Sequence, residues 1–277
     1  MIKKQYGIIG KPLSHSLSPT LHNFWFKKNN LNANYSLIEI EKGQIKNIIN
    51  KIRVKELDGI NVTVPYKQDV IPYLDLIIND AKETSSVNTI FLNNENKIVG
   101  ENTDVYGFEQ SFVNKLNEEN IIEKNILILG AGGVTPSLIY ALKKIKVKKV
   151  FVSNRTLQRV EDVKKKFSFI EIISWDRVFE KFEKMDIIIN ATSLGMKNGS
   201  NFEILIKKFK PNLIYYDVIY NPLETKMLKN FKDKNLKTFN GLEMFLFQGQ
   251  KSFSLWNKIT PNVDKEINAE IISSLKK

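Results

Sequence analysis

The chain contains no cysteine and only two histidines, His15 and His22, among its 277 residues. Without cysteine it can form no disulfide, no thiolate metal site and no cysteine nucleophile, and two histidines are too few for a histidine-rich metal site. We therefore expect chemistry without a metal. The lack of cysteine is compatible with a reducing compartment, and we predict a cytoplasmic location.

Long apolar runs are also missing. No stretch approaches the roughly 18 consecutive apolar residues that a membrane-spanning helix needs. The first ten residues begin with a basic segment, and Lys11-Pro12 follows where a signal peptide would continue its apolar region. We expect a globular protein with no membrane partner, and its length favours two modest domains.

The chain carries a formal net charge of +12, which raises the possibility of a nucleic-acid partner. Its basic residues are almost all lysines, and its four arginines are Arg53, Arg155, Arg159 and Arg177. Because base readout and bidentate phosphate contacts favour arginine, the composition favours a lysine-rich solvated surface over nucleic-acid binding. The same positive field would attract an anionic substrate and a phosphorylated cofactor.

Short β-branched runs alternate with helical stretches from Gln5 to about Asn102, which predicts a first α/β domain. The runs 87–92 and 97–99 are joined by four polar residues and predict a hairpin, so this sheet is expected to be mixed. The other predicted strands of this domain cover residues 5–10, 35–40 and 59–64.

A second α/β series has uniformly apolar strands, which suit a parallel, Rossmann-like sheet covered on both faces. Helices are predicted within 241–258 and 261–275, and they are expected to pack back on the first domain because no strand follows them. We therefore predict one domain from residues 1–103 with 241–277 and another from 104–240, with a helix near 104–117 passing between them. The predicted strands of the second domain cover residues 125–129, 149–153, 171–173, 186–190, 213–217 and 237–239.

A glycine-rich loop, Gly130-Ala131-Gly132-Gly133, lies between an apolar strand and a stretch of helical spacing. Glycine is needed in such a loop because a β-carbon would hold the backbone away from a pyrophosphate, which then binds at the helix N-terminus. The strand before and the helix after make this a candidate dinucleotide site.

The end of the next strand indicates which dinucleotide would bind. NAD-binding folds usually have a carboxylate there, whereas this chain has Asn154, Arg155 and Thr156, with Arg159 one helical turn on. This group would attract a 2′-phosphate, so NADP is favoured over NAD. The later segment Asn190–Met196 could approach the cofactor or form an ordinary turn, and its spacing does not decide between the two.

Two polar groups could bind a substrate. Ser16 and Ser18 precede a helix that starts at Pro19, where they could cap the helix or bind a small carboxylate, and the residues leave both readings open. Lys67 follows a strand and a proline turn, and Asp104 follows another strand. A lysine paired with an aspartate can exchange a proton with a substrate hydroxyl while a hydride moves. Further polar residues at neighbouring strand ends are Asn61, Thr63, Asn88, Asn102 and Thr103.

Together these segments resemble the shikimate dehydrogenase family, and the resemblance runs over essentially the whole chain. It implies a reversible, NADPH-dependent reduction of 3-dehydroshikimate to shikimate in aromatic amino-acid biosynthesis. It also implies a substrate-binding first domain, an NADP-binding second domain and a cleft that can close. The matching segments are residues 10–19, 61–67, 86–89, 102–104, 130–133, 154–156, 190–196, 217–222 and 241–248.

The resemblance also implies residue roles. Lys67 would be the acid/base group with Asp104 as its partner, and Ser16 and Ser18 would hold the substrate carboxylate with help from Tyr220. The residues implied for the ring hydroxyls are Asn61, Thr63, Asn88, Asp104 and Gln248. Those implied for the cofactor are Gly130, Ala131, Gly132, Gly133, Asn154, Arg155, Thr156, Arg159, Thr192, Ser193, Met196, Val218 and Gly241.

The chain departs from the family pattern at three places. Lys11 stands where asparagine is common, Ser85-Ser86 where Gly-Ala is common, and Val105 where glycine is common. Val105 should make the backbone less permissive at the start of the helix near 104–117.

The sequence is also compatible with two other functions. One is a quinate or quinate/shikimate dehydrogenase, which often uses NAD. The other is a non-catalytic dinucleotide-binding or nucleic-acid-binding module, which would not need Lys67 and Asp104 together. The expected partners are the small-molecule substrate and cofactor, with no nucleic acid, and the protein is expected to be a monomer or a homodimer.

Overall fold

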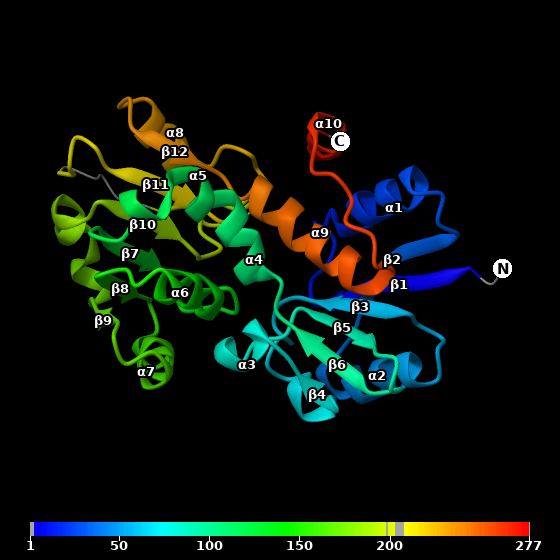
Figure 1. Ribbon diagram of the computed structural model, residues 1–277. Helices are drawn as coiled ribbons and strands as arrows, with labels where there is room; N and C mark the ends of the chain where they lie inside the picture. Colours follow the sequence, from blue (N-terminus) through cyan, green and yellow to red (C-terminus); the bar gives the residue numbers. More distant parts are fainter. Residues whose placement is uncertain (1–2, 198, 203–207, 277) are drawn as a thin grey trace. The chain divides into compact units, whose positions relative to one another are not determined.

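The computed structural model describes residues 3–197, 199–202 and 208–276. Its contacts divide the chain into two compact units, Met1–Gly107 with Leu246–Lys277 and Phe108–Phe245 (Figure 1). The division falls after Gly107 and before Leu246, a few residues beyond the boundaries at 103/104 and 240/241 that the sequence suggests. Each unit is described by itself.

The first unit contains a mixed sheet with the strand order β2-β1-β3-β5-β6-β4. Strands β1, β2 and β3 run parallel, and β5 and β6 form the predicted antiparallel hairpin. Sequence analysis missed β4, which has only two residues and therefore no readable alternation. The strands are β1 (Lys4–Gly10), β2 (Ala33–Glu39), β3 (Gly59–Val62), β4 (Leu76–Ile77), β5 (Thr89–Leu92) and β6 (Ile98–Glu101).

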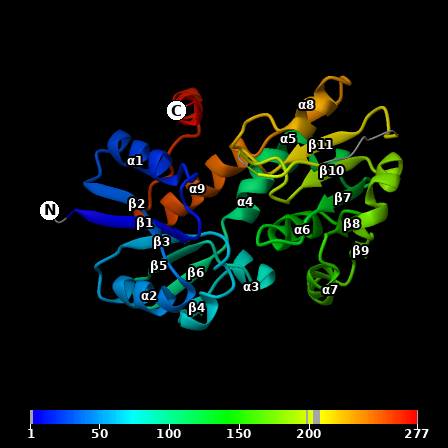
Figure 2. The same cartoon turned by 180° about the vertical axis from the view of Figure 1, so that it is seen from behind.

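Helices cover both faces of this sheet. The isoleucines of α2 pack on one face against Ile60 and Val62, while Tyr6 stacks with Phe26 and Trp256 on the other. Figures 1 and 2 show α1 and α2 on opposite sides of the strands. The helices are α1 (Ser18–Lys28), α2 (Ile45–Arg53), α3 (Asp80–Thr84), α9 (Leu242–Asn257) and α10 (Lys265–Leu275), with short 3₁₀ turns η1 (Lys42–Gln44) and η2 (Ile71–Tyr73).

The C-terminal helices are tied closely to the first unit. A β-carbon at Gly59 would lie 2.6 Å from Nε1 of Trp256, so this glycine lets α9 approach β3. The Asp264 side chain accepts hydrogen bonds from the backbone of Glu266 and Ile267 and thereby caps α10.

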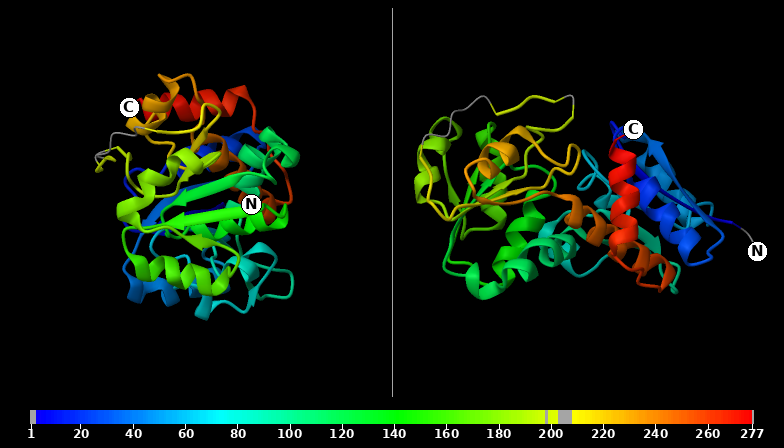
Figure 3. Two further views of the ribbon diagram at one scale, coloured as in Figure 1. Left: turned by 90° about the vertical axis from the view of Figure 1, so that its left-hand side faces the viewer. Right: turned by 90° about the horizontal axis from the view of Figure 1, so that it is seen from above.

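The second unit contains a six-stranded sheet in the order β12-β11-β10-β7-β8-β9. Every neighbouring pair is parallel, which confirms the predicted Rossmann-like sheet (Figure 3). The order reverses between β7 and β10, the position where open α/β sheets bind ligands. The strands are β7 (Asn125–Leu129), β8 (Lys149–Ser153), β9 (Glu171–Ile172), β10 (Ile187–Asn190), β11 (Ile214–Asp217) and β12 (Lys237–Phe239).

Helices cover both faces of the second sheet as well. Val178 and Phe182 pack on one face, and Phe112 packs against Tyr216 on the other. No described helix is both long and apolar enough to cross a membrane. Helix α4 (Asp104–Phe108) belongs to the first unit except for its last residue. The helical segments of the second unit are the π-helical turn η3 (Glu109–Val113), α5 (Asn114–Leu116), η4 (Glu118–Asn120), α6 (Thr135–Lys144), α7 (Leu157–Lys166), the 3₁₀ segment η5 (Trp175–Lys184) and α8 (Lys226–Lys232).

Candidate active site

One edge of the first unit's sheet gathers most of the predicted substrate residues. Strands β1, β3 and β6 run in the same direction, so they end at this edge, and the antiparallel β5 begins there. Because side chains that follow these strand ends share an edge, the topology explains their proximity. The predicted residues at this edge are Ser16 and Ser18 after β1, Thr63 and Lys67 after β3, Asn88 before β5, and Asp104 after β6.

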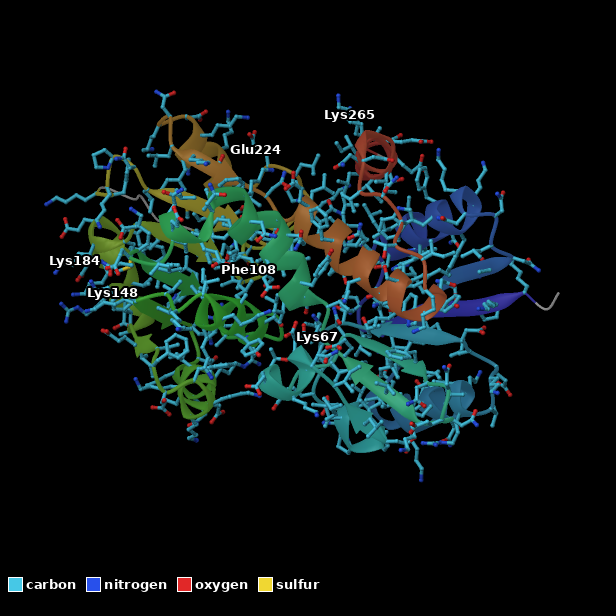
Figure 4. All side chains as sticks on the ribbon, viewed as in Figure 1. Lys67, Phe108, Lys148, Lys184, Glu224 and Lys265 are labelled. Atoms are coloured by element: carbon cyan, nitrogen blue, oxygen red, sulfur yellow. The ribbon has the colours of Figure 1, made fainter. Side chains whose placement is uncertain are left out.

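Lys67 and Asp104 form an ion pair, with 2.5 Å between Nζ and Oδ2. Their side chains are only 12% and 9% exposed, which distinguishes this pair from the solvated lysines of the surface. Asp104 is the first residue of α4, where a carboxylate is favoured by the helix dipole. Figure 4 shows Lys67 beside the start of α4.

Asn88 holds the other oxygen of this carboxylate. Its Nδ2 donates to Oδ1 of Asp104 at 2.9 Å and to the Thr103 hydroxyl at 3.0 Å, while its Oδ1 accepts from the Thr103 backbone N–H at 2.8 Å. The Asn88 side-chain amide cannot be flipped. In the flipped orientation its nitrogen would face the Thr103 N–H and its oxygen would face the Asp104 carboxylate. Asn88 therefore fixes the orientation of Asp104.

Asn61, on β3, faces helix α9 and is 5% exposed. Its Oδ1 accepts from the Tyr35 hydroxyl at 2.8 Å, and its Nδ2 is 3.0 Å from both the Asn88 carbonyl and the Ser252 hydroxyl. Asn61 thus ties β3 to β5 and to helix α9. Sequence analysis did not single out Ser252, although it lies one turn after Gln248 on the same helix.

Neither serine occupies the N-cap position of α1. Ser18 is the first helical residue, and the N-cap position belongs to Leu17, whose side chain makes no cap hydrogen bond. The Ser16 hydroxyl donates to the Ser18 hydroxyl at 3.2 Å, and Ser16 also accepts from the Ser18 N–H at 3.4 Å. Two adjacent hydroxyls at the N-terminus of an 11-residue helix can bind a carboxylate.

Thr63 is half-buried, and its methyl group packs so closely on Gly10 that a β-carbon there would lie 2.4 Å away. Gln248 lies on α9, and its backbone carbonyl accepts from the Ser252 hydroxyl at 3.0 Å. Tyr220 belongs to the second unit, where its ring stacks on Phe245 with 4.4 Å between centroids.

The glycine-rich loop of the second unit has the geometry of a phosphate-binding turn. Gly130 has φ of +108°, and a β-carbon there would lie 2.7 Å from the Ala191 carbonyl oxygen. A β-carbon on Gly132 would meet no protein atom within 4 Å. Gly130 is therefore required by the fold, whereas Gly132 leaves open space before the N-terminus of α6, where a pyrophosphate would fit.

Arg155 and Arg159 follow β8 and are exposed, and within the described residues neither makes an ion pair. The other two arginines are paired, Arg53 with Asp75 and Arg177 with Glu180. Two unpaired guanidinium groups beside the dinucleotide loop fit a 2′-phosphate. Nearby, Asn154 links the two loops: its Oδ1 accepts from the Ala131 N–H at 3.1 Å, and its Nδ2 donates to the Thr156 carbonyl at 2.9 Å.

The segment Asn190–Met196 is an internally bonded loop at the end of β10. The Oδ1 of Asn190 accepts from the backbone N–H and the hydroxyl of Thr192, at 3.0 and 2.7 Å. Ser193 and Met196 are exposed on this loop. Gly241 packs on the backbone of Val218, since a β-carbon there would lie only 2.0 Å from the Val218 carbonyl oxygen.

The three departures from the family pattern have clear structural settings. Lys11 forms an exposed ion pair with Glu41, which raises the pKa of Lys11 through their hydrogen bond. Ser85 adopts a left-handed conformation with φ of +47°, a region that favours glycine. Val105 is fully buried in α4 without a positive φ, so its β-carbon does not disturb the start of the helix. Among the described residues, no cluster of three or more acidic or histidine side chains could hold a metal.

This combination of a Rossmann-like unit and a buried lysine–aspartate pair defines an α/β dinucleotide-dependent oxidoreductase. The family model described as "Shikimate dehydrogenase substrate binding domain" matches residues 8–90, and that described as "Shikimate / quinate 5-dehydrogenase" matches residues 113–219. The chain belongs to the shikimate dehydrogenase family.

Curated relatives and solved structures agree with this assignment. A shikimate dehydrogenase (NADP(+)) of Pelagibacter ubique is 45% identical over 96% of this chain and 97% of the relative. The structure of shikimate dehydrogenase from Aquifex aeolicus has a TM-score of 0.88 and 36% identity, covering 98% of this chain and 99% of that one. A Thermus thermophilus shikimate 5-dehydrogenase in complex with NADP(H) and shikimate has a TM-score of 0.84 and 28% identity, covering 98% of this chain and 99% of that one.

Proposed function

We propose that this protein catalyses the reversible, NADPH-dependent reduction of 3-dehydroshikimate to shikimate. The observation that carries the proposal is the shielded Lys67–Asp104 pair, at the same sheet edge as the Ser16 and Ser18 hydroxyls, in a chain of this family. We propose that residues 1–103 with 241–277 bind the substrate and that residues 104–240 bind NADP.

Lys67 is the proposed proton donor in the reduction. NADPH, when bound, supplies the hydride that is added to the ring carbonyl carbon. Lys67 then gives a proton to the carbonyl oxygen, which becomes a hydroxyl, and in the reverse direction Lys67 takes that proton back. Asp104 accepts a hydrogen bond from the lysine and orients it, while Asn88 keeps the carboxylate in place.

The rest of the substrate would be held by its charge and its hydroxyls. Ser16 and Ser18 would donate to the substrate carboxylate with help from Tyr220, and the N-terminus of α1 would favour the negative charge. The proposed ring-hydroxyl set is Thr63, Asp104 and Gln248, with Asn61 and Asn88 behind them.

In the second unit, the open space at Gly132 and the N-terminus of α6 would accommodate the pyrophosphate. Arg155 and Arg159 would bind the 2′-phosphate with Asn154 and Thr156. The remaining proposed cofactor contacts come from Thr192, Ser193, Met196, Val218 and Gly241. This set has no carboxylate at the end of β8, which supports NADP over NAD.

A panel of two substrates and two cofactors tests the proposal. Purified protein with shikimate and NADP⁺ should form NADPH, and both quinate and NAD⁺ should be much poorer. Preference for quinate with NAD⁺ would instead indicate a quinate dehydrogenase, and binding without turnover would indicate a non-catalytic module. We also propose a monomer or homodimer in the cytoplasm, where NADPH is available for biosynthesis.

A further inference from the structure

Asp217, at the end of β11, is a completely buried carboxylate, and no lysine or arginine of the described residues forms an ion pair with it. Its Oδ1 accepts from Nδ2 of Asn190 at 3.1 Å and from the Ile219 N–H at 3.0 Å. Its Oδ2 accepts from the Thr225 hydroxyl at 2.8 Å, and the Tyr215 hydroxyl lies 3.5 Å away. Because these described partners are neutral donors, the buried charge of Asp217 has to hold them in a fixed arrangement.

The first of these bonds leads into the loop that follows β10. Asn190 donates one amide hydrogen to Asp217 and the other to the Leu194 carbonyl at 3.1 Å. The Asn190 side-chain oxygen accepts hydrogen bonds from the backbone N–H and the hydroxyl of Thr192. The Thr192 hydroxyl in turn accepts from the Leu194 N–H at 3.0 Å. The conformation of residues 190–194 is therefore set by one amide, and Asp217 fixes the orientation of that amide.

The other bonds lead to the turn after β11 and to α8. The Ile219 N–H is held by Asp217, and the adjacent Val218 is the residue on which Gly241 packs. Thr225 bonds to Asp217 and also caps α8 by accepting from the Leu228 N–H at 3.2 Å. Thr225 lies against Gly195 as well, since a β-carbon on that glycine would come 3.1 Å from the Thr225 β-carbon.

We propose that Asp217 is a positioning residue for NADP binding, because it locks the loop 190–196 and the turn 218–219 into one arrangement before the cofactor arrives. This inference rests on the proposed function, which assigns cofactor contacts to both segments. Burial raises the pKa of Asp217 to about 6, so at pH 7.5 the group is mainly a carboxylate that accepts from all its neighbours. A preorganised loop loses less conformational freedom on binding, which increases affinity.

The substitution Asp217→Asn tests the inference with little change in volume. The new amide has only one oxygen, which accepts more weakly than a carboxylate oxygen, so the bonds from Asn190 and Ile219 weaken. Its NH₂ group then faces the Thr225 hydroxyl, which loses its acceptor. Asp186→Asn is the control. Asp186 also bridges strands of this sheet by accepting from the Asn125 N–H, but it pairs with Lys210 and lies at the opposite edge, before β10.

The measurement is the dissociation constant of NADPH at pH 7.5, obtained by fluorescence titration without substrate, with circular dichroism as a check of folding. We expect Asp217→Asn to weaken NADPH binding by about tenfold and Asp186→Asn to change it less than about twofold. A folded Asp217→Asn protein that binds NADPH within about twofold of wild type overturns the inference. If Asp217→Asn does not fold, the NADPH dissociation constant of Asn190→Ala is measured instead, and a value within about twofold of wild type overturns the inference.

Turnover separates this inference from the proposed function. Wild-type protein that binds NADPH but does not oxidise shikimate contradicts the proposed function, and the comparison of binding constants still decides the role of Asp217. With active wild type, Asp217→Asn should raise the KM for NADP⁺ while the KM for shikimate stays unchanged. A rise in the KM for shikimate alone would contradict the positioning role.

Discussion

The Nζ atom of Lys67 lies 2.5 Å from Oδ2 of Asp104, and the other oxygen of Asp104 accepts from Asn88. Each oxygen of the Asp104 carboxylate thus has its own partner: Lys67, which the carboxylate orients, and the Asn88 amide, which cannot flip. This arrangement can present a lysine to a substrate oxygen at a fixed position, which acid/base catalysis requires.

Lys67→Ala should lower kcat by about 10²–10⁴-fold, because a positioned acid/base group contributes that much. Binding of shikimate should persist, since the serine pair and the other polar residues at this edge remain. Steady-state kinetics together with calorimetric binding would check both statements. Lys51→Ala, at an exposed position of α2, is the control and should behave as wild type. Near-normal turnover of Lys67→Ala would rule out its proton-transfer role.

Arg155→Ala should raise the KM for NADP⁺ much more than the KM for NAD⁺, because only NADP⁺ carries the 2′-phosphate. Arg177→Ala is a suitable control, since that arginine is exposed and paired with Glu180. Kinetics with both cofactors measure the difference. Equal changes for the two cofactors would show that Arg155 does not recognise the 2′-phosphate.

Gly132→Ala should weaken NADPH binding while the melting temperature stays near the wild-type value. The added methyl group would meet no protein atom within 4 Å, so a loss of affinity would report on the space reserved for the pyrophosphate. Gly43→Ala is the control because its β-carbon also meets nothing, and it lies on the exposed turn η1. If Gly132→Ala binds NADPH as tightly as wild type, the glycine loop does not hold the pyrophosphate.

His22 should make the stability of the protein depend on pH. Its ring is completely buried and stacks on Tyr35 at 4.4 Å. Neither of its nitrogens has a hydrogen-bond partner in the described part of the chain, and burial lowers its pKa to about 3. The unfolded state therefore binds a proton between about pH 6.5 and pH 3 that the folded state does not, and stability falls as the pH falls through this window.

Between pH 7.5 and pH 5, the His22 contribution should cost about 2 kcal/mol of unfolding free energy. His22→Phe keeps an aromatic ring and removes the titrating group. Between the same two pH values, the unfolding free energy of this variant should therefore fall by about 2 kcal/mol less than that of wild type. Urea unfolding at both pH values measures the difference. An identical pH dependence in the two proteins would mean that the pKa of His22 in the folded state lies close to its value in the unfolded state.

The fold was largely predictable because both sheets are built from apolar β-branched runs separated by helical stretches. Strand β4 was not, since two residues carry no period, and neither was the π-helical turn Glu109–Val113, whose sequence differs little from that of an α-helix. Lys67 and Asp104 are 37 residues apart, but both follow strands that end at one sheet edge, so their meeting could be expected.

The groups behind the site could not be predicted in the same way. Asn61 bonds to Ser252 across 191 residues, and only the packing of α9 on β3 brings them together. Asp217 ends a predicted strand, but its role depends on hydrogen bonds to Asn190 and Thr225, which the sequence does not reveal. Buried hydrogen-bond networks depend on tertiary geometry rather than on any sequence period.

The most direct test of the central claim is the initial rate of NADPH formation by purified protein, measured with shikimate or quinate and with NADP⁺ or NAD⁺. The account predicts rapid NADPH formation from shikimate and NADP⁺, with every other combination much slower, and it predicts that Lys67→Ala abolishes most of that rate. No turnover of shikimate, or a clear preference for quinate with NAD⁺, would contradict it.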